Sequence, residues 1–170
     1  MMQTYRIRNS FVLPLGLVVL LCLILAAIVI IQEQPSAKLL VVGCALLPLG
    51  YLLFECVVRR IEVDSDGLRL IRLGRVRAFT WSEITAVETV RVRQRAFLTI
   101  NAGDDFLIIA NMYAGFDHLL GTVLAQVSAT TISEETRLLA QAPPTKHSDI
   151  VILWGLALMM AYLIYAQFPH

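Results

Sequence analysis

Three long apolar runs, each with basic residues gathered at one end, set the main constraint on how this chain folds. The runs cover residues 11–31, 39–58 and 150–168. Each is close to the ~20 residues that a helix needs to cross the hydrocarbon core of a bilayer. The chain is 58% hydrophobic and only 16% charged, which is too apolar for an ordinary soluble domain. The sequence therefore predicts an integral membrane protein with three transmembrane helices.

The basic residues beside these runs predict the orientation. They are Arg6 and Arg8 before the first run, Arg59 and Arg60 after the second, and Lys146 and His147 before the third. The loop between the first two runs carries one acid and one base, Glu33 and Lys38. By the positive-inside rule, the N-terminus and residues 59–147 are expected in the cytoplasm, and the C-terminus on the periplasmic or extracellular side. Residues 1–58 then form a short tail and a helix hairpin.

The membrane runs carry few polar residues. Cys22, Cys44 and Cys56 all fall inside them, where small apolar packing is expected rather than a disulfide framework or a metal site. Glu55 is an acid within the second run, and such acids are candidates for proton or ion sites. However, Arg59 follows it at the i,i+4 spacing that favours a helical ion pair. We expect a Glu55–Arg59 pair at the membrane edge.

The segment after the second run predicts several short strands and then one helix. Strands are expected at residues 60–64, 68–73, 76–81, 82–93, 96–100 and 105–110, separated by turns at 64–67, 74 and 101–104. Apolar residues at helical spacing then predict an amphipathic helix over 115–128. The fold class is thus α+β, an antiparallel barrel or sandwich at 59–130 closed by one C-terminal helix. A short helix from Ser133 and a proline-rich linker at 142–145 fill 131–149 and lead to the third run.

Three short stretches of this segment resemble the bacterial pleckstrin-homology (PH) domain proteins. They are the turn Val63-Asp64-Ser65-Asp66-Gly67-Leu68, the aromatic stretch Phe79-Thr80-Trp81-Ser82-Glu83-Ile84, and the closing helix with Leu119, Leu120 and Val123. The resemblance covers about residues 59–129. It implies a PH-like barrel at a bacterial inner membrane, and many members carry paired membrane helices before the domain. It implies no catalytic residues, because the family has none in common.

The residues themselves predict no catalytic, metal or cofactor site. Asp64-Ser65-Asp66-Gly67 begins like a calcium loop, but its glycine comes early and no glutamate follows at the twelfth position, so a tight turn is favoured. Asp104-Asp105 is expected at a solvated hairpin tip. His118 has no second histidine or cysteine at ligand spacing. We therefore expect a protein that is not an enzyme.

Four arginines gather around the turn at Gly74: Arg69, Arg72, Arg75 and Arg77. Guanidinium groups bind phosphate in a bidentate manner, so this cluster is a candidate contact for anionic lipid headgroups. A solvated strand face near a negative leaflet is the interpretation we favour, because the membrane helices already tether the domain. Nucleic acid is not expected as a partner, since few aromatics are interleaved with the bases.

Residues 106–109 are apolar on both faces of their predicted strand. A small barrel buries one face of each strand, so the second face needs another cover. We expect Leu107 or Ile109 to contact another chain or the membrane helices.

These features favour a non-enzymatic scaffold or interaction protein that self-associates or docks other proteins. An accessory or assembly subunit of a larger membrane complex is the alternative, and a sensor of anionic lipid headgroups is a further one. The expected partners are membrane lipids together with a second copy or other membrane-complex subunits.

Overall fold

The computed structural model describes residues 2–92, 95–141 and 148–168, and the chain divides into two compact units. The helical unit consists of Asn9–Val57 and His147–His170, and the sheet unit of Met1–Arg8 and Val58–Lys146. The predicted linker at 142–145 and the flanking pair Lys146 and His147 lie outside the described residues.

The helical unit contains α1 (Asn9–Ile31), α5 (Ser148–Tyr165) and most of α2 (Ser36–Val58). By length and composition, α1 and α2 are long and apolar enough to cross a membrane. The third apolar helix is shorter, at Asp149–Tyr165. Two of the three predicted spans therefore have the length and composition that a crossing requires.

An apolar seam holds the helical unit together. Val18, Cys22 and Leu25 of α1 are buried against Ala157 and Met160 of α5. On α2, a row of partly buried side chains packs against the same cluster, namely Val42, Leu46 and Leu49. The spacing of each set keeps its members on one face of a helix.

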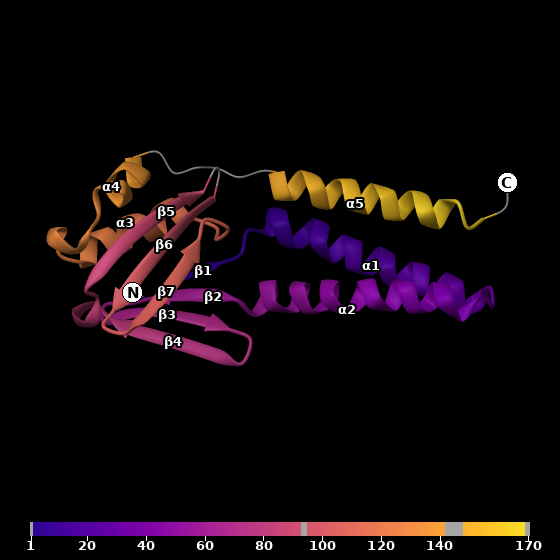
Figure 1. The fold of residues 1–170 in the computed structure, drawn as a ribbon, viewed down its shortest axis with the longest axis horizontal. Helices are drawn as coiled ribbons and strands as arrows, with labels where there is room; N and C mark the ends of the chain where they lie inside the picture. Colours follow the sequence, from indigo (N-terminus) through magenta and orange to yellow (C-terminus); the bar gives the residue numbers. More distant parts are fainter. Residues whose placement is uncertain (1, 93–94, 142–147, 169–170) are drawn as a thin grey trace. The chain divides into compact units, whose positions relative to one another are not determined.

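The sheet unit is a pair of antiparallel sheets with two helices (Figure 1). The first sheet has the order β1-β2-β3-β4 and the second the order β5-β6-β7. The strands are β1 (Gln3–Arg6), β2 (Arg60–Val63), β3 (Gly67–Arg72), β4 (Arg75–Thr80), β5 (Ala86–Val92), β6 (Arg95–Ala102) and β7 (Asp105–Ala110). The helices are α3 (Phe116–Gln126) and α4 (Glu134–Gln141). The predicted small antiparallel α+β domain is confirmed at this level.

Strand β1 corrects the prediction that the first residues form only a tail. It pairs along its length with β2, and Tyr5 lies opposite Ile61. Tyr5 and Ile7 are buried, whereas Thr4 before them and Arg6 between them are exposed. The hairpin of α1 and α2 is therefore inserted between two neighbouring strands of one sheet.

Alternating side chains from both sheets fill the core of the sheet unit. Fully buried examples are Ile61, Leu68, Leu98, Ile100 and Ile109. The buried face of α3 adds Phe116, Leu119, Leu120 and Val123. The predicted amphipathic helix is thus confirmed.

Between β4 and β5 the structure differs from the sequence-based expectation of continuous strand. A short 3₁₀ helix, Trp81–Glu83, separates the two sheets. Glu83 accepts a hydrogen bond from the Thr80 main-chain N–H at 2.9 Å, and this bond holds the pKa of the Glu83 carboxyl below its usual value. The Trp81 indole N–H donates to the carbonyl of Asp64 at 3.1 Å. The chain can therefore change sheets here without leaving these polar groups unpaired.

The predicted turn at 64–67 is present. Asp64 Oδ1 accepts the N–H groups of Asp66 and Gly67, each at 2.9 Å, and these bonds lower the pKa of the Asp64 carboxyl. A Cβ at Gly67 would lie 2.1 Å from the carbonyl oxygen of Phe79. Only glycine fits this close approach of backbones.

Candidate functional site

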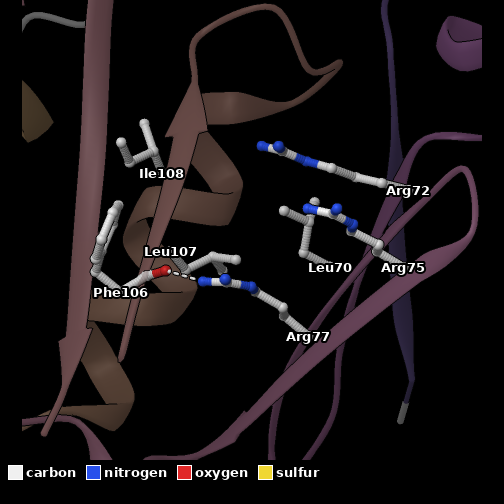
Figure 2. Close-up of a pocket in the computed structure, with 7 residues that line it drawn as sticks. All are labelled: Leu70, Arg72, Arg75, Arg77, Phe106, Leu107 and Ile108. Carbon is white, nitrogen blue, oxygen red and sulfur yellow. Dashed lines mark hydrogen bonds between the residues drawn. The ribbon is translucent and has the colours of Figure 1, made fainter. Parts of the chain in front are cut away.

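The site is a hollow of about 220 Å³ between the β3–β4 hairpin and strand β7 of the sheet unit (Figure 2). We call it the arginine hollow. Its lining residues are Leu70, Arg72, Arg75, Arg77, Phe106, Leu107 and Ile108. Leu70 and Leu107 are buried and supply apolar surface, and the guanidinium ends of the three arginines point from the hairpin toward β7.

Strand register brings together three of the four predicted arginines. Arg72 lies opposite Arg75, and Arg77 lies opposite Leu70, so all three share the face that carries Leu70. Arg69 lies opposite Ala78 on the other face of the same hairpin. The expectation of one four-arginine cluster is therefore wrong for Arg69, because successive side chains of a strand point to opposite faces.

The arginine hollow has an excess of positive charge. Like charges directly opposite each other on neighbouring strands are destabilising, and Arg72 and Arg75 form such a pair. Arg77 is engaged with β7. Its Nη1 donates to the carbonyl oxygen of Phe106 at 2.9 Å and lies 3.8 Å from Oδ1 of Asp105, which is largely exposed. Three guanidinium groups at one hollow make it a candidate site for an anionic group.

The two faces of β7 are opposite to those we expected. Leu107 and Ile109 are 2% and 0% exposed and point into the core, so the prediction that they contact a partner is wrong. Phe106 and Ile108 are 53% and 40% exposed instead. All four residues are apolar, so their own pattern could not distinguish the faces. Strand β6 indicates which face is exposed, because its polar residues Asn101 and Thr99 lie opposite Phe106 and Ile108.

The exposed side of the second sheet carries exposed apolar side chains among polar ones. Phe106 and Ile108 lie on it together with Val90 of β5, which is also exposed. Register places all three on one side, because Val90 lies opposite Phe97, and Phe97 lies opposite Ala110 of β7. We call Val90, Phe106 and Ile108 the outer apolar face.

The chain itself covers the free edge of the first sheet at the C-terminal end of β1. Arg8 N–H donates to Met112 O at 3.1 Å, and Ala114 N–H donates to Arg6 O at 2.8 Å. Between them, Ile7 bridges to the fully buried Tyr113. These contacts continue the first sheet by one short segment.

Part of the edge of β5 is covered as well, at Val87 and Thr89. Ile132 forms a parallel bridge with Val87, and Ser133 N–H donates to Val87 O at 3.1 Å. The buried Thr136 hydroxyl at the start of α4 donates to Thr89 Oγ1 at 2.9 Å. The short helix predicted from Ser133 thus seals one edge of the second sheet.

Arg59 contacts Tyr113 in the sheet unit. Its Nε donates to the Tyr113 phenol at 2.8 Å, and its guanidinium carbon lies 5.8 Å from the centre of the Tyr113 ring. Arg59 thereby ties the start of β2 to the segment after β7. The ion pair with Glu55 stays a prediction.

Other polar clusters are small. Tyr5 lies beside His118, with 2.7 Å between the phenol oxygen and Nδ1. Among the residues that the structure describes, no group of three or more His, Cys, Asp or Glu side chains could hold a metal ion. Comparison with protein-family models, with curated proteins and with solved structures finds no match for this chain.

Proposed function

We propose that this chain is a non-enzymatic, membrane-anchored interaction protein whose sheet unit is a PH-like scaffold domain on the cytoplasmic face of a bacterial inner membrane. The outer apolar face carries the proposal. Three exposed apolar side chains share one side of a three-stranded sheet, and surfaces of this kind serve as protein contacts more often than isolated exposed residues do.

The strand arrangement supports a PH-like domain. A four-stranded and a three-stranded antiparallel sheet are followed by α3, whose apolar side is buried. This is the layout that the resemblance implies, with one difference. The membrane hairpin lies between the first two strands rather than before the domain.

Chain connectivity supports the proposed topology. Since β1 and β2 pair in one sheet, a hairpin that crosses the membrane twice must begin and end on the same side. The arginines at both of its ends favour the cytoplasmic side. Helix α5 is proposed as a third span, since its 18 residues fall at the short end of the range that can cross a bilayer.

An accessory or assembly subunit of a larger membrane complex is the alternative, and it uses the same outer apolar face. A sensor of anionic lipid headgroups is a further alternative, and the convergence of Arg72, Arg75 and Arg77 favours it. The outer apolar face distinguishes these candidate functions, because binding of a lipid headgroup does not require exposed apolar side chains on the second sheet.

The test is the native mass of the full chain extracted in a mild detergent. We expect an assembly that Ile108→Lys disperses, because a charge would be placed in the centre of the outer apolar face. Val76→Lys is the matched control, an exposed aliphatic residue on the first sheet, and it should leave the assembly intact. Copies of this chain alone favour the scaffold, and unlike subunits in fixed ratio favour the accessory role. A wild-type monomer would contradict both.

A further inference from the structure

We infer that the open edge of β7 binds an extended protein segment with alternating acidic and apolar side chains, which pairs with β7 as an added strand. This inference rests on the proposed function, because it names the partner that an interaction protein of this shape would bind.

The four sheet edges differ in whether another segment of the chain lies against them. Main-chain hydrogen bonds cover the edge of β1 at its C-terminal end and the edge of β5 at Val87, as described above. Among the residues that the structure describes, β4 and β7 each pair with one neighbouring strand, and the arginine hollow lies between them. Edges left open are templates for a further strand.

The backbone of β7 presents its hydrogen-bonding groups outward at the right residues. Asn111 N–H donates to Ala96 O, which fixes the alternation of bonded pairs along β6 and β7. It follows that the main-chain groups of Phe106 and Ile108 point away from β6. Arg77 confirms the direction, since its guanidinium donates to the Phe106 carbonyl from the outside. The Arg77 N–H thus occupies the position from which a main-chain N–H of an added strand would donate to the Phe106 carbonyl.

The two sides of an added strand would meet different surroundings. Its inward side chains would face the arginine hollow, where Arg75 and Arg77 offer guanidinium groups for carboxylates. Its outward side chains would continue the outer apolar face beside Phe106 and Ile108. Alternation of acidic and apolar residues satisfies both sides at once.

The size of the hollow supports side chains rather than a whole small molecule. Its volume of about 220 Å³ is below the ~300–1,000 Å³ typical of small-molecule pockets. One or two acidic side chains of a bound strand suit this space.

The experiment measures binding of labelled peptides to the full chain in nanodiscs of neutral lipid. The probe is an end-capped peptide of about six residues, the length of an ordinary strand, alternating valine and glutamate. We expect binding that slows amide hydrogen exchange at Ile108, and that a central proline or replacement of glutamate by lysine abolishes. Arg75→Gln and Arg77→Gln should each weaken binding by about two- to fivefold. Arg69→Gln is the control on the opposite face and should leave it unchanged.

Three results would overturn the inference. The first is no binding, and the second is equal binding by the Arg75 and Arg77 variants, since these arginines would then only discourage edge pairing. The third is protection of Ile108 and loss of peptide binding on adding anionic lipid, since a headgroup would then be the occupant. The outcome is separable from the proposed function. If peptide binding fails while Ile108→Lys still disperses the native assembly, the result contradicts the added strand but not the proposal of an interaction protein.

Discussion

The covered edges and the open edges of the two sheets differ in what lies against them. The β1 edge is held by two main-chain hydrogen bonds and a buried tyrosine, and the β5 edge by a strand bridge and a buried threonine pair. The β4 and β7 edges carry exposed side chains, and an arginine spans the space between them. In the described part of the chain, two edges are thus partly covered by apolar and polar contacts, and the edges of β4 and β7 have no further strand beside them.

The largest effect is expected at the β1 edge. Tyr113→Ala should lower the free energy of unfolding by about 3–5 kcal/mol, because a fully buried aromatic ring is lost. Chemical denaturation of the full chain in detergent, followed by Trp81 fluorescence in a Trp154→Phe background, measures it. Tyr113→Phe keeps the ring and removes the bond to Arg59, so it should cost only about 1 kcal/mol. Equal losses for the two variants would show that the ring does not hold the edge.

At the β5 edge the expected effect is intermediate. Thr136→Val removes a hydroxyl and leaves the buried Thr89 oxygen without this donor, at a cost of about 1–3 kcal/mol. Hydrogen exchange of the Ser133 amide, which donates to Val87, should accelerate. The same change at Thr122, whose hydroxyl bonds the carbonyl of His118 on α3, serves as the control. Unchanged exchange at Ser133 would mean that the threonine pair does not secure this edge.

At the open β7 edge, substitutions of exposed side chains should barely affect stability. Phe106→Thr is expected to change the free energy of unfolding by no more than about 0.5 kcal/mol. Leu107→Ala, one residue along on the buried face, should cost about 2–5 kcal/mol. The same denaturation measurement compares the two. Similar losses would mean that both faces of β7 are buried in the full chain.

The smallest effect concerns the turn that joins β2 to β3, away from all four edges. Main-chain N–H groups hold the pKa of Asp64 below its ordinary value of 3.8. A depressed folded-state pKa stabilises the fold above that ordinary value, and the contribution is lost as the pH falls through the folded-state pKa. Asp64→Asn keeps an acceptor oxygen and should flatten the acid limb of stability against pH. Asp66→Asn removes an equal charge and is the control. If wild type and Asp64→Asn lose stability identically at acid pH, the Asp64 carboxylate does not stabilise the fold in this way.

Local patterns in the sequence were sufficient for the long elements. Apolar runs of the right length predicted α1 and α2, and helical periodicity predicted α3. Turn chemistry predicted the Asp64–Gly67 turn, because it depends on residues that are adjacent in the chain. In each case the deciding interactions lie within one element or one turn.

Features that depend on distant pairing were harder to predict. Strand β1 has four residues, and its partner β2 begins only after the intervening segment 7–59, which contains the helix hairpin. The apolar residues Tyr5 and Ile7, alternating with polar ones, were therefore its one local signal. The residues of the arginine hollow were hard to predict for the same reason. A strand period of two could have separated Arg69 from Arg72, but only the neighbour β6 shows which face of β7 is inside.

Insertion of the hairpin between β1 and β2 has a consequence for biogenesis. The first strand leaves the ribosome long before its partner, and it can pair only after both helices have been made. If one helix failed to insert, β1 and β2 would be stranded on opposite sides of the bilayer and the first sheet could not close. If α1 and α2 cross a membrane, closure of the first sheet therefore requires that both helices insert, because β1 and β2 must end on the same side.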